Sequence, residues 1–353
     1  MVLSGFGALL FAMAGGDGQL ALKGFDPVEL IDGREVAGER ALFVDHGPFR
    51  YLFVSEDNRD LFLDAPERWG IQWDGACGRM GPLSGMGMPD RFAVWNDRIW
   101  VFASDQCRTG FLKAPEKLQP PDDAAPAPDD AAKAAGQALL EKAAAAFGDL
   151  AALDALKSIH LHAKLESVSG TTLYEGTRDL WFAFPGRYRF EEAWGGRGYG
   201  HAVSGAAAKR FSPEEELPLG AVSTKVALRE ALQQPLWIAR ERKNLLAVPA
   251  GSDTVEGQPV ELVTVHAAQQ NVTLAIDAKS GRLVELRHLA LTARGYAPLV
   301  RRVTGWQTIG KLTLPVRLQS VSAGGLADDS VKGEPQLELD VALDEQLFAL
   351  PAK

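Results

Sequence analysis

Apolar and polar residues alternate along much of the chain after residue 158, and this period of two predicts β-strands with one apolar face. Turn residues such as Lys279-Ser280-Gly281 separate the alternating segments. The predicted strands cover residues 159–168, 171–184, 188–192, 260–265, 272–276, 283–291 and 337–343. The Gly-rich run 196–200 predicts a loop. The strands together predict an antiparallel sheet whose apolar face needs a cover.

Two segments of the same region have helical periodicity instead. Residues 134–147 place Leu139, Leu140 and Ala143 on one face. Residues 221–239 form a second helical segment, and its apolar positions suit the open face of the sheet. The pattern therefore predicts an α+β fold in which helices cover an antiparallel sheet.

An internal repeat lies closer to the N-terminus. Residues 51–69 and 100–118 are offset by 49 positions and are identical at eight of nineteen. Each copy reads as a short strand, then a serine (Ser55 or Ser104) that can cap a helix, then an amphipathic helix ended by Ala-Pro. Because one such unit cannot bury its apolar face alone, we expect the two copies to share a small core.

A polar tract separates the repeat region from the predicted sheet. Residues 119–133 read QPPDDAAPAPDDAAK and contain neither an aromatic nor a branched aliphatic residue. Such a composition predicts a semi-extended linker. The length of 353 residues also favours two domains, which we expect over residues 20–118 and 134–353.

Charge and the N-terminal residues bear on partners and compartment. The net charge of −9, with no basic run, argues against nucleic acid as a partner. Residues 2–14 are apolar and end in Ala12-Met13-Ala14, so residues 1–14 predict a signal peptide and a periplasmic or otherwise exported protein; a buried N-terminal strand or helix is the alternative. No other apolar stretch reaches the roughly 18–20 residues that span a bilayer, so no membrane span is expected in the mature protein.

The N-terminal region resembles a known family. The run Gly24-Phe25-Asp26-Pro27-Val28, the run Gly33-Arg34-Glu35-Val36-Ala37-Gly38 and residues 51–69 are similar to the YHS domain, a small treble-clef-like module related to metal-sensing TRASH domains. The resemblance covers residues 20–118 and implies an accessory module that binds a partner or a metal. Metal-associated members carry a cysteine at the strand-to-helix corner; this chain has Asn58 there in the first copy and Cys107 in the second.

The two cysteines leave three interpretations open. Cys77 and Cys107 can form a disulfide, bind a soft metal such as copper together with Met80, or remain buried, inert thiols. Met80, Met86 and Met88 follow Cys77 closely, in a Gly-rich segment. Thioethers are soft ligands for Cu(I), but methionines also fill irregular gaps between aromatic rings.

The C-terminal region resembles a second family. The run Ala152-Leu153-Asp154-Ala155-Leu156, the run Phe184-Pro185-Gly186-Arg187-Tyr188, the pair Leu314-Pro315 and the ending Leu347-Phe348-Ala349-Leu350-Pro351 follow the order found in the outer-membrane lipoprotein-sorting family, which includes the LolA and LolB carriers. The resemblance implies a half-open β-barrel, closed by helices around an apolar cavity that receives acyl chains. Trp181, Phe182 and Phe184 are candidate cavity residues, with ordinary core packing as the alternative.

Motifs of catalysis are absent from the sequence. It has no Gly-x-Ser-x-Gly elbow, no Walker A loop, no His-Glu-x-x-His and no strand-linked Gly-x-Gly-x-x-Gly, so a non-enzymatic protein is predicted. His160 and His162 are two apart on a predicted strand and share one face, as metal ligands on a sheet can, but no third ligand is near them in the sequence. A half-buried strand face explains the two histidines equally well.

Two functional hypotheses follow. In the first, the C-terminal half-barrel of an exported binding protein holds a lipid or lipoprotein acyl chain, which requires an open apolar cavity of roughly several hundred Å³. In the second, the protein handles copper through Cys77, Cys107 and Met80, with the barrel as scaffold.

Overall fold

The computed structural model describes residues 18–292, 294–322, 325–327 and 330–351, so the predicted signal peptide lies outside the described residues. The chain divides into two compact units. Of the described residues, the first contains 18–119 with Leu219–Ser223 and 294–295, and the second contains Pro120–Pro218, Thr224–Thr292 and the described part of 296–351.

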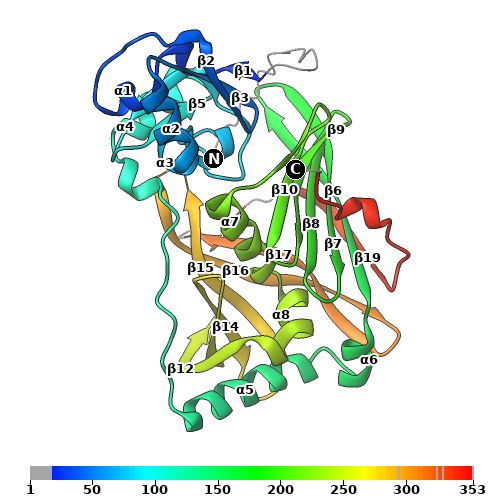
Figure 1. The fold of residues 1–353 in the computed structure, drawn as a ribbon. Coiled ribbons are helices and arrows are strands. Elements are labelled where there is room, and N and C mark those ends of the chain that lie inside the picture. The colour runs from blue at the N-terminus through cyan, green and yellow to red at the C-terminus, as the bar shows by residue number, and fades with distance from the viewer. Residues whose placement is uncertain (1–17, 293, 323–324, 328–329, 352–353) are drawn as a thin grey trace. The chain divides into compact units, whose positions relative to one another are not determined.

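The N-terminal unit contains two small sheets with short helices (Figure 1). The strand order is β1-β3-β2 in the first sheet and β4-β5 in the second. The strands are β1 (Gln19–Leu20), β2 (Glu39–His46), β3 (Phe49–Phe53), β4 (Met88–Val94) and β5 (Ile99–Phe102). The helices are α1 (Pro27–Ile31), α2 (Glu56–Asp64), α3 (Pro66–Trp69) and α4 (Asp105–Leu112).

The predicted strand-helix repeat is confirmed. Ser55 accepts a hydrogen bond from the Asn58 N–H at 3.2 Å and caps α2, and Ser104 accepts one from the Cys107 N–H at 3.1 Å and caps α4. Phe62 and Phe111 occupy the same position in the two helices and are fully buried. The local sequence therefore determines both the start of each helix and the residue that anchors it.

The two copies share a core, as expected. Phe53 and Phe62 of the first copy lie in one buried cluster with Val101 of the second and with Ile99 directly before it. A parallel bridge joins Ile71 to Ile99 and links the copies through the backbone. Neither strand-helix unit has to bury its apolar face alone.

Asn58 has a structural role at its strand-to-helix corner. The buried carboxylate of Asp26 accepts hydrogen bonds from the N–H groups of Val28 and Val54, both at 2.8 Å, and from the Asn58 amide at 2.9 Å. The Asn58 amide also donates to Glu29 at 3.2 Å. An amide thus satisfies a buried acid in the first copy, where the second copy has the thiol of Cys107.

The C-terminal unit contains two seven-stranded antiparallel sheets. The first has the order β11-β10-β9-β8-β7-β6-β19, and the second runs from β12 to β18 in sequence order. The first sheet consists of β6 (Ser158–Ser169), β7 (Thr172–Ala183), β8 (Arg187–Trp194), β9 (Arg197–Ser204), β10 (Ala207–Phe211), β11 (Glu216–Pro218) and β19 (Val331–Leu339). The second consists of β12 (Leu246–Val255), β13 (Gln258–Ala267), β14 (Gln270–Asp277), β15 (Leu283–Thr292), β16 (Gly295–Ile309), β17 (Leu312–Ser322) and β18 (Gly325–Leu326).

The two sheets adjoin and form a half-barrel. Arg317 of β17 donates to the Val331 carbonyl at 3.1 Å, and the Leu337 N–H donates to Gln307 at 3.2 Å. Figure 1 shows the sheets curving around two helices, α7 (Ala221–Leu232) and α8 (Pro235–Glu241). The predicted α+β class and helix-covered antiparallel half-barrel are confirmed.

Two local predictions are corrected. The predicted helix 221–239 is two helices, because Pro235 lacks the N–H group that a continuous helix would need. The predicted loop 196–200 is wrong: the chain turns at Gly195 and Gly196 and then enters β9. Gly200 lies so close to β8 that a Cβ atom would meet the Phe190 carbonyl oxygen at 2.0 Å, so glycine permits this strand pairing.

Helices α5 (Asp130–Ala145) and α6 (Leu150–Ala155) are joined to α8 through a buried arginine. Arg242, which directly follows α8, has a side chain only 1% exposed. Its guanidinium forms ion pairs with Glu141 of α5 at 2.7 Å and with Asp154 of α6 at 2.6 Å. One residue therefore fixes three helices.

The Pro, Asp and Ala tract makes specific contacts with the C-terminal unit. Asp122 lies 2.7 Å from both Lys225 and Arg229 of α7. The carboxylate of Asp123 accepts from the Asn271 N–H at 2.7 Å. A composition without aromatic or branched aliphatic side chains cannot build a core, but its carboxylates hold these residues against the unit. The same tract runs into α5, which Asp129 caps four residues earlier than predicted.

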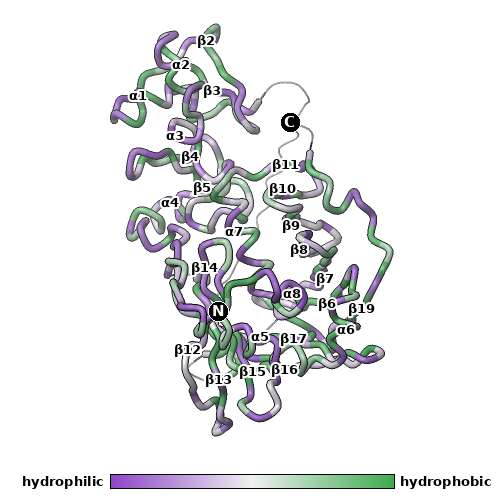
Figure 2. Tube along the Cα trace, turned by 60° about the horizontal axis from the view of Figure 1, so that its bottom comes forward, coloured by the Kyte–Doolittle hydropathy of each residue, from purple (hydrophilic) through white to green (hydrophobic). Residues whose placement is uncertain are grey.

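No helix among the described residues is both long and apolar enough to cross a membrane. Figure 2 shows hydrophobic and hydrophilic residues alternating over short distances along the chain.

Candidate functional site

Strand alternation divides the β7 side chains between the two faces of the first sheet. Phe182 faces the concave side and pairs across the sheet with Tyr188 of β8. The neighbouring Trp181 faces the convex side and stacks on His160 with ring centroids 5.0 Å apart. The structure therefore separates Trp181 from the other two candidate cavity residues.

Phe182 and Phe184 belong to an aromatic cluster on the concave face. Their rings stack at 6.2 Å, and Trp237 of α8 lies 6.3 Å from Phe182 and 6.0 Å from Phe184. Tyr188 lies 5.3 Å from Phe182. We call Phe182, Phe184, Tyr188 and Trp237 the aromatic wall. It joins the sheet to α8.

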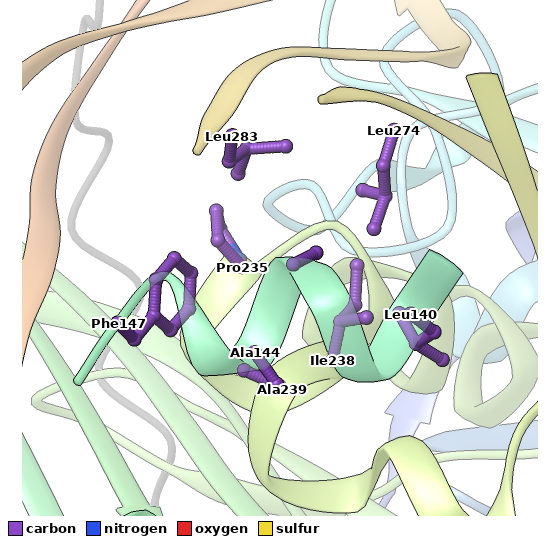
Figure 3. Close-up of a pocket in the computed structure, with 9 residues that line it drawn as sticks. Leu140, Ala144, Phe147, Pro235, Ile238, Ala239, Leu274 and Leu283 are labelled. Atoms are coloured by element: carbon purple, nitrogen blue, oxygen red, sulfur yellow. The ribbon is translucent and has the colours of Figure 1, made fainter. Parts of the chain in front are cut away.

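An apolar pocket lies between the helices and the second sheet (Figure 3). Side chains from α5, α8, β14 and β15 line it: Leu140, Ala143, Ala144, Phe147, Pro235, Ile238, Ala239, Leu274 and Leu283. Its cavity volume is about 10 Å³, about enough for one water molecule. The open cavity of several hundred Å³ expected from the sequence is not found at this position, because the protein's own side chains fill it.

Charged residues extend the concave face beyond the aromatic wall. Arg178 of β7 forms an ion pair with Glu192 of β8 at 2.9 Å. The same carboxylate accepts hydrogen bonds from the Trp194 indole at 2.8 Å and the Tyr199 hydroxyl at 3.1 Å. Burial, with Glu192 beside it, raises the pKa of Tyr199 to about 12, so its hydroxyl keeps its proton as a donor.

Glu230 reaches this face from α7. Burial raises the pKa of its carboxyl to about 7, against the opposing effect of Arg301 and Arg178. Nevertheless 38% of its side chain is accessible, and the carboxylate lies 3.4 Å from the Nε2 atom of His201. Part of the Glu230 side chain therefore stays exposed although its carboxyl lies among buried charged groups.

Arg301 of β16 is a buried cation near Arg178 and Glu230. Burial, and secondly the charge of Arg178, lower the pKa of its guanidinium. Within the described part of the chain, its guanidinium has no hydrogen bond or ion pair. The neighbouring Glu230 carboxyl offsets this charge only in part, so the desolvated guanidinium favours an anionic ligand.

Two neutral histidines complete the set. Burial lowers the pKa of His201 to about 3 and that of His288 to about 4, so both rings are uncharged at neutral pH. The Nε2 atom of each ring has no hydrogen-bond partner among the described residues. We call Arg178, Glu192, His201, Glu230, His288 and Arg301 the polar interior. It can bind a polar or anionic group next to the aromatic wall.

The predicted sulfur site lies in the N-terminal unit. Cys77 and Cys107 are free thiols close enough to influence each other, and burial, with Cys107 nearby, raises the pKa of Cys77. The Ala103 N–H also donates to the Cys77 sulfur at 3.3 Å. The side chain of Met80 is 39% exposed, whereas Met86 packs against the aromatic core of the unit. The structure brings the two thiols together and leaves the Met80 side chain at the surface.

Sequence analysis missed the polar interior. Arg178, Glu230 and Arg301 share faces with buried apolar residues, and this is the signal that could have identified them. Arg178 is two residues from Leu180 on the same face of β7, and Glu230 is next to the buried Ala231. Charges at core positions of an amphipathic pattern are candidate functional groups.

Comparison with known proteins finds no matching family model and no matching curated protein. Among solved structures, a DUF1329 family protein from Desulfovibrio piger matches 62% of this chain and 97% of its own, with 11% identity and a TM-score of 0.41. A LolA superfamily protein from Nitrosomonas europaea matches 61% and 97%, with 12% identity and a TM-score of 0.40. A domain described as an outer membrane lipoprotein-sorting protein from Vibrio parahaemolyticus matches 61% and 97%, with 8% identity and a TM-score of 0.36. All three scores are below 0.5, so the fold described above rests on its own strands and helices.

Proposed function

We propose that the chain is an exported, non-enzymatic binding protein whose half-barrel holds a lipid or lipoprotein acyl chain. The observation that carries this proposal is the aromatic wall beside the polar interior on one concave face. An amphiphile requires both surfaces, because its chain needs apolar contact and its headgroup needs polar partners.

The residues suggest how the ligand lies. Phe182, Phe184 and Trp237 would contact the acyl chain, and the buried guanidinium of Arg301 would receive an anionic headgroup. The apolar pocket is the closed, ligand-free arrangement in this proposal. Since its cavity measures about 10 Å³, α5 or α8 must move away from the sheet to admit a chain.

The N-terminal unit would serve as an accessory module. Its strand-helix repeat and the resemblance to YHS domains support a role in binding a partner or a metal. The neighbouring thiols of Cys77 and Cys107 support either a disulfide or soft-metal binding, and a copper-handling protein is the alternative function. The apolar block before Ala14 supports export.

Lipid binding can be tested on the full chain. Protein purified from a bacterial periplasm is examined by native mass spectrometry for retained lipid, and is then titrated with oleate and with phosphatidylglycerol. The variant Arg301→Gln removes the buried cation and should weaken binding roughly tenfold or more, because a charge-assisted hydrogen bond contributes about 1.5–3 kcal/mol.

Arg287→Gln is the matched control. Arg287 follows the fully buried Leu286 on β15, so it faces the opposite side of the sheet, where it pairs with Asp253 at 2.8 Å. This variant should bind both lipids like the wild type. Absence of retained lipid together with no saturable binding of either lipid overturns the proposal, and so does equal weakening by both substitutions.

A further inference from the structure

Four polar side chains gather on the convex face of the first sheet, outside the polar interior. His160 and His162 lie on β6, Asp179 on β7 and Glu338 on β19. The register places His162 opposite Asp179 and His160 opposite Glu338. Three adjacent strands therefore bring residues that are far apart in the sequence to one point.

The ligand atoms are within coordinating reach of one another. The Asp179 Oδ1 atom lies 2.8 Å from His160 Nε2 and 2.8 Å from His162 Nδ1. One ligand atom from each of these three residues lies within 4.8 Å of the other two. Metal–ligand bonds of about 2.0–2.2 Å place tetrahedral zinc ligands about 3.3 Å apart, so small side-chain rotations would convert the hydrogen bonds into coordination bonds.

We infer that His160, His162 and Asp179 form a binding site for a divalent transition metal of the zinc type. Two imidazoles and one carboxylate suit Zn²⁺, whereas Mg²⁺ and Ca²⁺ take oxygen ligands and Cu(I) prefers sulfur. Three protein ligands leave a fourth position for water. The side chains are 21%, 29% and 16% exposed, so a metal ion can reach them from solvent.

Glu338 and Trp181 orient the first histidine. The Glu338 carboxylate lies 3.4 Å from His160 Nδ1, and this contact directs Nε2 toward Asp179. The Trp181 ring is nearly parallel to the His160 ring, with an interplanar angle of 2°. Glu338 is thus a positioning residue that strengthens the site without binding the metal.

Zinc binding can be tested in a full chain that carries Cys77→Ser and Cys107→Ser, so that no thiol contributes. Calorimetric titration with Zn²⁺ should give one equivalent bound at micromolar affinity or tighter, and Co²⁺ should give the intense visible absorption of a four-coordinate site. Asp179→Asn and His162→Ala should each weaken binding by about 100-fold, and Glu338→Gln by about 10-fold.

His266→Ala is the matched control, because His266 lies on β13 and bonds to Asn271 at 2.8 Å, away from Asp179. It should leave zinc affinity unchanged. Circular dichroism establishes that each variant is folded; if His162→Ala unfolds, Asp179→Asn and Glu338→Gln carry the test. Absence of stoichiometric zinc binding overturns the inference, as does binding that survives Asp179→Asn or that His266→Ala weakens equally.

Discussion

Single residues explain where sequence patterns succeed and where they fail. The serine caps were predictable, because a cap needs only a local hydroxyl and the next few N–H groups. The third ligand of the histidine pair was not, because Asp179 meets His162 only through strand pairing. Ligands that meet only through strand pairing cannot be identified until the register of the sheet is known.

Glu230 should make the stability of the protein depend on pH. Its pKa rises from 4.5 to about 7 on folding, so the folded state holds the proton more tightly and stability falls as pH rises from about 4.5 through 7. Glu230→Gln removes this loss. Because the side chain is 38% accessible, solvent screening reduces the expected gain in unfolding free energy to about 1 kcal/mol at pH 8.

Urea unfolding of wild type and Glu230→Gln at pH 4 and pH 8 measures this effect. The two proteins should differ little at pH 4, where the carboxyl is protonated in both states. An equal difference at both values of pH would contradict the role assigned to this residue.

Cys77 and Cys107 should form a disulfide under mild oxidation. Both thiols are free, and burial, with Cys107 near enough to contribute, raises the pKa of Cys77. Intact mass after treatment with diamide should fall by about 2 Da, and the closed loop should add on the order of 3 kcal/mol to stability. A Cys107→Ser variant serves as control. An unchanged wild-type mass, with both thiols still alkylated after unfolding, would exclude the pairing.

At the scale of elements, the alternation of apolar and polar residues predicted strands that have one apolar and one polar face. It missed several strands that lack this pattern. Each of the seven predicted segments overlaps an observed strand, although 337–343 shares only its first three residues with β19. Strand β16 was missed because Arg301 and Arg302 are adjacent charged residues, which interrupts the alternation of apolar and polar positions. Arg301 lies in the polar interior, and Arg302 pairs with Glu285 on the other face. Arg301, which belongs to the polar interior, is therefore also one of the two residues that prevented the prediction of β16.

Substitution of Arg242 should reduce the stability of the protein, because this residue connects α5, α6 and α8. Arg242→Met keeps much of the buried volume but removes both ion pairs, with Glu141 and with Asp154. The carboxylates are about one-third exposed and regain water, so we expect a loss of about 2 kcal/mol at pH 7. Arg242 holds the pKa of Asp154 at about 2, so this contribution is present above pH 4 and is lost as pH falls toward 2.

Thermal unfolding at pH 7 compares Arg242→Met with Arg287→Met. The second substitution removes an exposed pair with Asp253 and a pair with Glu285, which keeps Arg302 as a partner, and should cost about 1 kcal/mol. Equal costs would show that burial of Arg242 does not govern the stability of the helix cluster.

At the scale of the whole molecule, composition correctly marked the tract 119–133 as unable to form a core, but it did not show where the aspartates attach. Asp122 pairs with Lys225 and Arg229, which lie about a hundred positions away in the sequence. Such a contact leaves no local trace, so no pattern within the tract could have indicated it.

Asp122→Ala should release the tract. Hydrogen exchange of residues 119–129, followed by mass spectrometry, should become faster, while the melting temperature changes by only a few degrees. Asp130→Ala removes a carboxylate that is fully exposed and should leave the exchange unchanged. Slow exchange in both variants would mean that other contacts hold the tract.

The break at Pro235 has a kinetic consequence. It separates α7, which carries Glu230, from α8, which carries Trp237, so the headgroup side can stay assembled while the chain side swings open. Under the lipid-binding function proposed above, a pocket of about 10 Å³ would have to open before an acyl chain could enter. The rate of lipid binding would then be set by this opening, and it should level off as lipid concentration rises.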